Sequence, residues 1–550
     1  MDLVFATNDD MYLRMILSGE ITGTPEAHIF HIGYPVGVLL SFLYRLFPNI
    51  PWYGIFLFLL TIISLIVVST AVLSLMKTYR EKIVGILFIV IFTVSFFGAH
   101  IIRITYTTTA IFVGAAALLL FYTRDEKVYG KKFACSMIPA MLLYVLSLFL
   151  RFKAGVMLLP FWGCFGVAKI VLNHKSARNI VFMGGCILLL TITGFGIFKL
   201  SYNTEEWKNF TQYDNARTKI YDYEGFPTYR ENADFYEKNG ISEYDLRCAQ
   251  KYYMLLNNEE ISEYVIIDIA KYIPKTILNV KKIFKDFIYY HLFSYVDRPF
   301  NIVVYGMYLF CFILIFLQKE WKAFVDMLML FCGRMTIWIY LLYGGRILYR
   351  ITQGIYFVEF FVLMAICFRY KLWRTLKRKK VISAIVLVGM TAYVFLAARY
   401  GIPYEQRLLR ENRQIVKKAE AFQELKLYFA ENRDNLYLCD MNSFTGFTEG
   451  IFENPDTEQD NFLFMGSWLV NSPWYDQVLR QYDIDPSDID ALTKGNIYFA
   501  FQGTNWDYFE KYYKEKISDL QVRVENTYIT ANGMEFYILR LQTEEGKDGY

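Results

Sequence analysis

The stretch FATNDDMYLRMILSG near the amino terminus places Asn8, Asp9 and Asp10 side by side in a chain otherwise dominated by apolar residues. Neighbouring carboxylates can serve as a general base or bind a metal ion. They can also cap a helix, since Asn and Asp are favoured caps before a helical pattern such as MYLRMILSG. Adjacent side chains on a helix point about 100° apart, so we expect Asp9 and Asp10 to have different roles.

Composition indicates that these acids belong to a membrane protein. The chain has 550 residues, of which 55% are hydrophobic and 18% aromatic, and its mean hydropathy is +0.26. Such values are rare in a water-soluble protein of this length. Apolar runs long enough to cross a bilayer as helices recur through the first 400 residues. We expect ten spans, at 52–76, 83–99, 105–123, 133–150, 154–173, 179–200, 301–317, 322–343, 352–368 and 381–398.

Two long segments are too polar to cross a bilayer. Residues 201–300 mix charges with Tyr and Trp, which predicts a large loop. Residues 399–550 begin with a charged helical pattern, and the strand-like runs NLYLC, NFLFMG, NIYFAF and MEFYILRL follow it. The predicted fold class is therefore a polytopic α-helical membrane protein with a C-terminal α/β domain. The expected divisions are an acidic-motif segment with a juxtamembrane helix at 1–51, transmembrane helices at 52–200 and 301–398, the loop at 201–300, and the α/β domain at 399–550.

The distribution of Lys and Arg predicts how the spans are oriented. The short loops on one side carry 18 such residues, and those on the opposite side carry five. The first side is expected to be cytoplasmic, so the amino-terminal segment, the large loop and the α/β domain are expected to be extracytoplasmic. An outward amino terminus without a signal peptide favours a start placed too far downstream, with LVFA as the tail of a further helix. That helix would make eleven spans.

Five cations lie in the short loops on the outer side: Arg103, Arg151, Lys153, Arg346 and Arg350. One interpretation places them at the lipid headgroups. Their contexts, HIIRITYTTTA, FLRFKAGVMLLP and YGGRILYRITQG, put them at helix ends beside hydroxyls or glycines, where the positive-inside rule disfavours cations. Arg suits phosphate because its planar fork donates two parallel hydrogen bonds. The second interpretation is that these cations hold a lipid-linked phosphate near the acidic pair.

These features together resemble the GT-C superfamily of integral membrane glycosyltransferases: the acidic pair, the juxtamembrane stretch HIFHIGYPVGVLLSFLYRLFPNIPWYG, many spans, outward arginines and a soluble C-terminal domain. The chain is similar to protein mannosyltransferases and aminoarabinose transferases. The resemblance concerns the architecture of about residues 1–400, and NDD alone matches a family motif residue by residue. It implies transfer of a sugar from polyprenyl phosphate to a cell-envelope acceptor, whether glycan, lipid or protein, at the outer face of a bacterial membrane.

The resemblance also implies roles for the candidate residues. Asp9 is expected to deprotonate the acceptor in an inverting displacement, with Asn8 orienting it and Asp10 contacting the acceptor or a metal ion. The leaving phosphate requires cations that are already in place. In order of preference, the expected cations are Arg346, Arg350, Arg103, Arg151 and Lys153.

Other residues are candidates for lining the site. Arg334, within LFCGRMTIW, is the one charge expected deep in a span, where it either lines the site or bridges helices. His100 lies on the same outer side. Tyr221 and Tyr223 either stack on a sugar ring or pack at the membrane interface. The histidines lack the ligand spacing of a metal motif, so the metal is unknown, no cofactor is assigned, and a divalent cation stays open.

Two other function classes remain open. A lipid or polysaccharide transporter or flippase should show repeated halves and ionisable groups near the bilayer midplane. A non-catalytic scaffold of envelope assembly should tolerate the loss of Asp9. The sequence contains no Gly-rich phosphate loop or dinucleotide fingerprint, and its net charge of +4 lies mainly in the loops expected in the cytoplasm, so no nucleic acid partner is expected.

Overall fold

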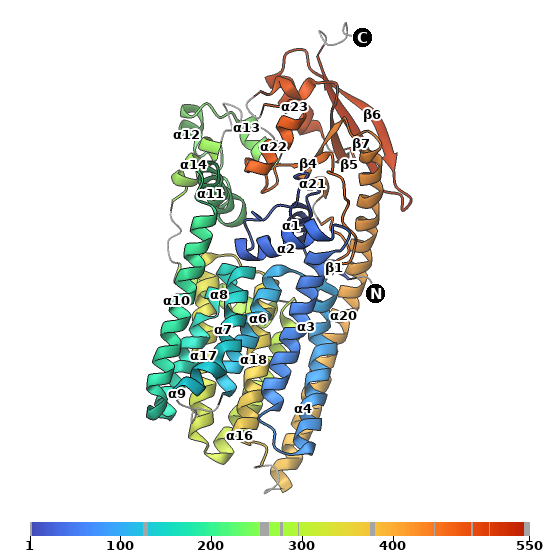
Figure 1. Cartoon of the computed structure of the whole chain (residues 1–550). Helices are drawn as coiled ribbons and strands as arrows, with labels where there is room; N and C mark the ends of the chain where they lie inside the picture. Colours follow the sequence, from blue (N-terminus) through green and yellow to red (C-terminus); the bar gives the residue numbers. More distant parts are fainter. Residues whose placement is uncertain are drawn as a thin grey trace.

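The computed structural model describes residues 3–124, 130–252, 263–274, 279–294, 296–374, 380–444, 446–485, 488–504 and 506–543. The protein has three layers (Figure 1). Long apolar helices form a bundle, and α1 (Asn8–Ser18) and α2 (Tyr34–Leu46) lie across one end of it. The C-terminal sheet and the helices between residues 205 and 272 form a roof above α1 and α2.

Eight helices in the described ranges are long and apolar enough to cross a membrane. They coincide with eight of the ten spans expected from the sequence, because a continuous apolar run of this length identifies such a helix directly. The eight are α3 (Trp52–Leu73), α6 (Tyr106–Thr123), α7 (Lys131–Leu150), α8 and α9 (Phe152–Met157 and Leu159–Leu172), η2 and α10 (His174–Ser176 and Ala177–Ser201), α16 (Arg298–Gln318), α17 (Trp321–Gly344) and α18 (Tyr349–Arg369).

The other two expected spans also fall on helices. The first is divided into α4 (Tyr79–Phe92), the π-helical turn η1 (Thr93–Phe97) and α5 (Gly98–Ile102). The second lies in α20 (Lys380–Ala430), a 51-residue helix that follows the bundle and continues into the roof (Figure 1). The predicted fold class, a polytopic helical protein with a C-terminal α/β region, is confirmed.

The amino-terminal segment is fastened to both the bundle and the roof. Strand β1 (Val4–Phe5) pairs in parallel with β2 (Arg103–Ile104), and Val4 also forms an antiparallel bridge to Gly450 of the roof. Helix α1 ends at Gly19, whose φ of 92° is the left-handed conformation that glycine adopts without penalty. These contacts fix the helix that carries the NDD motif.

The described parts of residues 201–300 form short helices, so the expected large loop is structured there. Their bounds are α11 (Glu205–Thr218), η3 (Lys219–Glu224), α12 (Ala233–Lys238), α13 (Glu243–Gln250), α14 (Glu263–Tyr272), α15 (Val280–Ile288) and η4 (Tyr289–Phe293). This segment binds the C-terminal region through an ion pair of 2.9 Å between Lys516 Nζ and Asp245 Oδ1.

The C-terminal region contains a mixed five-stranded sheet in the order β4-β3-β5-β7-β6. Strand β3 runs parallel to β4 and β5, whereas β7 runs antiparallel to β5 and β6. The strands are β3 (Leu436–Asp440), β4 (Phe462–Met465), β5 (Ile497–Gln502), β6 (Gln521–Ile529) and β7 (Glu535–Gln542). The helices are α21 (Met441–Phe444), α22 (Pro473–Gln481), η5 (Asp490–Thr493) and α23 (Asp507–Lys516).

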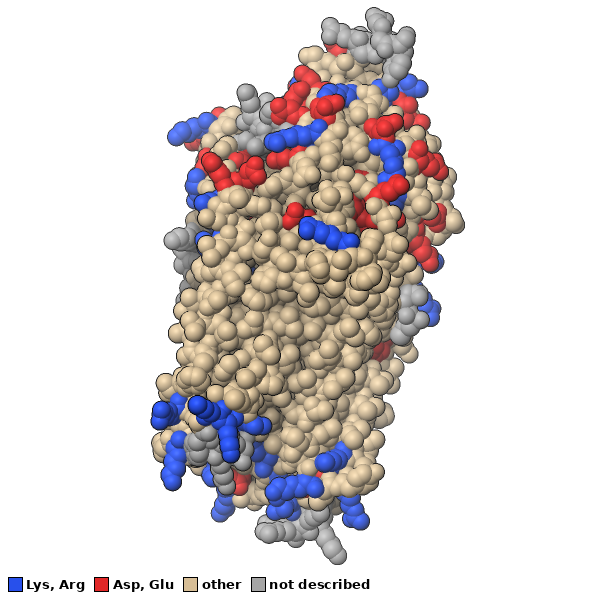
Figure 2. Space-filling view, in the orientation of Figure 1, with Lys and Arg blue, Asp and Glu red and all other residues tan. Residues whose placement is uncertain are grey.

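Charge is distributed unevenly along the molecule (Figure 2). Lys and Arg gather at the end of the bundle opposite the roof, a belt almost free of charge follows, and both signs mix over the roof. The connections at the basic end include the one from α3 to α4, with Lys77, and the one from α16 to α17, with Lys319. The positive-inside rule predicts that this end is cytoplasmic.

Candidate functional site

Asp10 is a buried contact between α1 and the bundle. Its carboxylate accepts hydrogen bonds from the hydroxyls of Thr7 at 2.8 Å and Tyr53 at 2.9 Å, and from the backbone N–H of Tyr106 at 3.0 Å. Burial raises the pKa of Asp10 to about 6 in spite of these donors. Because Tyr53 lies at the start of α3 and Tyr106 at the start of α6, the bonds fasten α1 to two membrane helices.

Asp9 has a different environment from its neighbour. It is half-buried, and within the described ranges it makes no hydrogen bond or ion pair. Its charge acts on nearby phenols: burial and then Asp9 raise the pKa of Tyr12 well above its ordinary value. Asn8, which the sequence suggested as an orienting group for Asp9, hydrogen-bonds to Tyr12 one turn further along α1. The Asp9 carboxylate is thus available to an incoming group.

Asp9, Arg151 and Arg350 lie around the ring of Tyr106. The guanidinium carbon of Arg151 lies 5.3 Å from the centroid of the Tyr106 ring, and the ring of His31 lies parallel to it at 6.4 Å. Asp9, Arg151 and Arg350 all act electrostatically on the Tyr106 hydroxyl. The structure therefore brings together residues that are about 340 positions apart in the sequence.

A cluster of four cations faces His31; we call Arg151, Lys153, Arg217 and Arg350 the anion site. Burial and then these four cations lower the pKa of His31 well below its ordinary value, so this imidazole is neutral at physiological pH. Arg151 Nη1 also donates a hydrogen bond of 3.3 Å to the backbone carbonyl of His31. The combined positive charge of the four cations favours an anionic ligand.

Among the residues that the structure describes, three cations of the anion site are not paired with a carboxylate. In the part of the chain that the structure describes, Arg151, Lys153 and Arg350 form no ion pair, and the buried Nε of Arg350 has no hydrogen-bond partner. Two acids, Asp214 of α11 and Asp222 of η3, act on Lys153 from nearby. Burial raises the pKa of Asp214 to about 6, although Arg217, Lys153 and Arg151 oppose the increase.

Two of the expected phosphate-binding arginines already have carboxylate partners. Arg346 Nη1 lies 2.5 Å from Asp222 Oδ2, and its guanidinium lies 5.7 Å from the ring centroid of Tyr223. Arg103 Nη1 lies 3.1 Å from Glu411 Oε2 of α20, and Arg103 Nη2 donates to the carbonyl of Leu408 at 3.0 Å. Arg103 therefore braces the long helix.

The remaining candidates lie outside the group around Tyr106. The hydroxyl of Tyr221 donates to the carbonyl of Ala249 at 2.6 Å, and its ring stacks on Tyr252. His100 is buried among aromatic rings, with Phe112 at 5.3 Å and Phe300 at 6.1 Å between centroids. Both residues have the packed surroundings of core side chains.

Arg334 lies at mid-helix in α17 and pairs with Glu359 of α18, whose Oε1 is 2.8 Å from Arg334 Nε. Both side chains are buried, and Arg334 lines a cavity of about 350 Å³ between α16 and α17. Arg334 is therefore not the one charge deep in a span: Glu359 and Asp326 are also buried there. The sequence reading overlooked both acids because single charges in long apolar runs barely alter the hydropathy.

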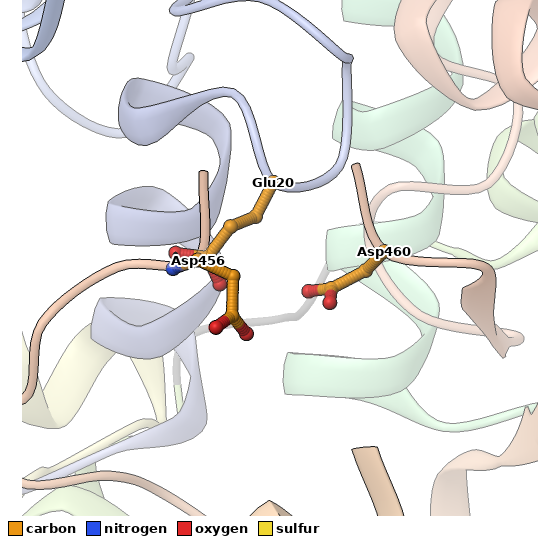
Figure 3. A group of neighbouring side chains, drawn as sticks. All are labelled: Glu20, Asp456 and Asp460. Atoms are coloured by element: carbon orange, nitrogen blue, oxygen red, sulfur yellow. Dashed lines mark hydrogen bonds between the residues drawn. The ribbon is translucent and has the colours of Figure 1, made fainter. Parts of the chain in front are cut away.

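A group of three carboxylates could hold a cation. Glu20 follows α1, and Asp456 and Asp460 precede β4; one oxygen of each lies within 4.8 Å of the others (Figure 3). The ammonium of Lys426 lies 3.0–3.3 Å from oxygens of all three. Lys426 thus already supplies positive charge at this position.

Four residues of the site were not among those expected from the sequence: His31, Tyr106, Asp214 and Arg217. Arg217 and Asp214 lie in the segment read as a loop, where charges are frequent and no pattern distinguishes a functional one. His31 was weighed only as a metal ligand. Tyr106 could have been found, because it lies three residues after Arg103, in RITYTTTA, at the outer start of an expected span. Tyr is enriched at that depth.

Comparisons with known proteins give a distant structural similarity. No protein-family model and no curated protein matches the chain. Among solved structures, the chain is similar to ArnT from Cupriavidus metallidurans in the apo state, with 10% sequence identity over 98% of this chain and 94% of that chain and a TM-score of 0.39. A similarity this low assigns no residue and no substrate, so the roles proposed below rest on the contacts of this chain.

Proposed function

We propose that this protein is a membrane glycosyltransferase of the GT-C type. It transfers a sugar from a polyprenyl-phosphate donor to a cell-envelope acceptor. One observation carries the proposal: Asp9, Arg151 and Arg350, which have no ionic partner among the described residues, surround Tyr106. This group lies where α6 and α18 begin and α7 ends, which is the depth of a lipid headgroup phosphate.

The reaction is an inverting displacement. Asp9 takes the proton of an acceptor hydroxyl or amine as that atom bonds to the anomeric carbon. The bond from the anomeric carbon to the phosphate oxygen breaks, and its electron pair leaves with polyprenyl phosphate. Arg151 and Arg350 stabilise the charge that develops on this oxygen without having to reorganise. No metal ion is required by these steps.

The other residues position this machinery. Asp10 holds α1 on the bundle, so that Asp9 stays at a fixed distance from the anion site. Lys153 and Arg217 add positive charge, and Arg346 holds Asp222 at the border of the site. We place the site and the C-terminal region on the extracytoplasmic side of the cell membrane, because the Lys and Arg of the short connections gather at the opposite end.

The test is release of polyprenyl phosphate by the reconstituted full chain. The protein is supplied with labelled polyprenyl-phosphate sugars and a crude envelope extract as acceptor. We expect one donor to be turned over by the wild type and by Asp268→Asn, a control at an exposed acid of α14. We expect Asp9→Asn to reduce turnover by about 10²–10⁴-fold with donor binding intact, the range for a general base. Equal rates in wild type and Asp9→Asn would contradict the assignment of Asp9.

A lipid transporter is the second candidate, because Arg334 and Glu359 form a buried ion pair deep in the bundle. The two functions differ in their products. A transporter moves fluorescent polyprenyl phosphate across a proteoliposome membrane without cleaving a sugar bond. Translocation that disappears in Glu359→Gln, together with no sugar release from any donor, would favour it over the transferase.

A further inference from the structure

One edge of the C-terminal sheet faces the proposed site. Strands β3, β4 and β5 run parallel, so their carboxyl ends lie at the same edge, which is where parallel sheets bind ligands. Just after β3, Met441 Sδ accepts a hydrogen bond of 3.7 Å from the Tyr12 hydroxyl of α1. Just after β4, the ring of Trp468 lies 4.4 Å from the ring of His31. The edge is thus in contact with the helix that carries Asp9.

The chemistry of the displacement assigns a side to the acceptor. In an inverting reaction the nucleophile and the leaving group lie on opposite faces of the sugar. The leaving phosphate is bound by Arg151 and Arg350 at the end of the bundle. The acceptor therefore approaches from the other side, past Asp9, where the roof lies.

The residues after β4 have the composition of a site for a neutral polar ligand. Residues 466–475, GSWLVNSPWY, contain no charged side chain. Within this segment the rings of Trp468 and Trp474 are 6.2 Å apart, and Trp474 lies 5.1 Å from Trp207 of α11. The segment therefore presents a set of aromatic faces beside the cationic site.

Three buried polar groups of this segment have no partner in the described ranges: Trp468 Nε1, Trp474 Nε1 and the Tyr475 hydroxyl. Trp468 is 6% exposed and Trp474 4%. A buried donor without an acceptor destabilises a protein unless a ligand or water satisfies it. Three such groups within eight residues point to a ligand that brings several hydrogen-bond acceptors.

We propose that residues 466–475, the acceptor segment, bind a neutral saccharide as the acceptor; the inference rests on the proposed function. Aromatic rings pack on the C–H faces of a sugar, and its hydroxyl oxygens accept hydrogen bonds from the indole N–H groups. An anionic acceptor would compete with the donor phosphate for the cations of the anion site. A neutral saccharide satisfies the unpartnered donors without disturbing those charges.

The roof is closed on this segment, so binding includes a movement. Gly466 has a φ of 63°, and its carbonyl accepts a bond of 3.4 Å from Arg217 Nη2. Since Trp468 is buried against His31, a sugar reaches its ring once the two side chains separate. Binding is therefore expected to change the tryptophan fluorescence.

The experiment measures saccharide binding to the full chain in nanodiscs that contain polyprenyl phosphate. The probes are neutral gluco-, manno- and N-acetylglucosamine oligosaccharides, with a uronic acid oligosaccharide as the anionic comparison. We expect at least one neutral probe to bind. Trp468→Phe and Trp474→Phe, which keep a ring but remove the N–H, should each weaken binding about tenfold, as expected for one lost hydrogen bond. Trp321→Phe, at an exposed position of α17, is the control and should leave binding unchanged.

The results separate this inference from the proposed function. Where transfer is measurable, the two indole variants should raise the acceptor KM and leave the donor KM unchanged. Transfer with unchanged acceptor KM in both variants, or binding of the anionic probe alone, would overturn the acceptor segment while the transferase stands. Neutral saccharide binding that both variants weaken, with no transfer from any donor, would support the segment and contradict the transferase. No binding of any neutral probe would overturn the inference.

Discussion

Two charged clusters are attached to the same short helix, α1, and they differ in how their charges are balanced. In the first, Arg14 forms a two-pronged contact with Glu449 of the roof and pairs with Glu20. Lys426 of α20 pairs with Glu20 and with the other two acids of Figure 3, Asp456 and Asp460. We call this cluster the clamp. Each of its ions has a partner of opposite sign.

The second cluster, Asp9 with the anion site, shows no such pairs within the residues that the structure describes. Asp9 and Arg14 are five residues apart, yet Arg14 is buried among carboxylates, whereas Asp9 contacts no cation in the described part of the chain. A paired cluster holds segments together, because each of its buried cations already contacts carboxylates. A cluster of unpaired charges costs folding energy and is retained where a ligand completes it. The comparison therefore separates structure from function within one helix.

Breaking the clamp should have the largest effect on stability. Arg14→Ala leaves Glu449 buried without its partner and Glu20 paired with Lys426 alone. Leaving a buried charge unpaired typically costs about 3–5 kcal/mol. We expect a large decrease in the midpoint of thermal unfolding in nanodiscs. The control is Arg247→Ala, because Arg247 forms an exposed ion pair with Glu243 whose loss should leave the unfolding midpoint nearly unchanged. Equal midpoints for the two variants would contradict the role of the clamp.

Removing a cation from the anion site should leave stability unchanged and reduce turnover. Arg350→Gln removes a group that faces the leaving phosphate, and the loss of one such donor typically reduces kcat by about 10²–10³-fold. Arg103→Gln is the matched change at an arginine that is already paired with Glu411. Arg103→Gln should lower the unfolding midpoint and leave turnover nearly unchanged. The opposite pattern would exchange the roles of the two arginines.

Donor binding should depend on pH through Asp214. Its pKa is raised to about 6, so the carboxyl is mostly neutral below pH 6 and charged above it. As the pH falls from about 7.5 to 5.5, loss of this negative charge should strengthen binding of the donor, a phosphodiester whose own charge is constant, by a few-fold. His31 does not titrate in this range, because its pKa is lowered. Asp10 also has a pKa of about 6, so binding to Asp214→Asn should keep a smaller dependence on pH. A profile like that of the wild type would contradict this assignment.

The smallest effect is expected at Lys153, which is the exposed member of the anion site. Lys153→Gln should raise the donor KM about twofold, because exposed charges are screened by solvent and salt. The difference from wild type should disappear at about 1 M salt, where screening extends over only a few ångströms. A larger change that persists at high salt would mean that Lys153 contacts the phosphate directly.

Much of the fold could be predicted from the sequence because its signals are local. The apolar runs predicted the membrane helices, and four runs of the C-terminal region predicted β3, β4, β5 and β7. Strand β6 was missed because its residues are largely exposed, so QVRVENTYI lacks a buried apolar face. The helices of residues 201–300 were read as a loop, since their polar composition obscures short amphipathic stretches.

The site could be predicted only in part because its residues meet through tertiary contacts. The NDD motif and the outer arginines were visible as residue types in unusual places. The sequence could not tell which arginines are already paired, since Arg103 and Arg346 find their partners Glu411 and Asp222 far along the chain. For the same reason it could not separate Asp10, which is bound by three donors, from Asp9.

The central claim is that Asp9 acts as the base, and chemical rescue of Asp9→Ala tests it most directly. Azide is an anionic nucleophile that needs no deprotonation, so it can replace the acceptor when the base is missing. With the donor found in the turnover assay, we predict that Asp9→Ala releases almost no polyprenyl phosphate by itself. Added azide should restore release and yield a glycosyl azide of inverted configuration. Failure of azide to restore release in a folded variant that binds donor, or normal transfer without azide, would contradict the account.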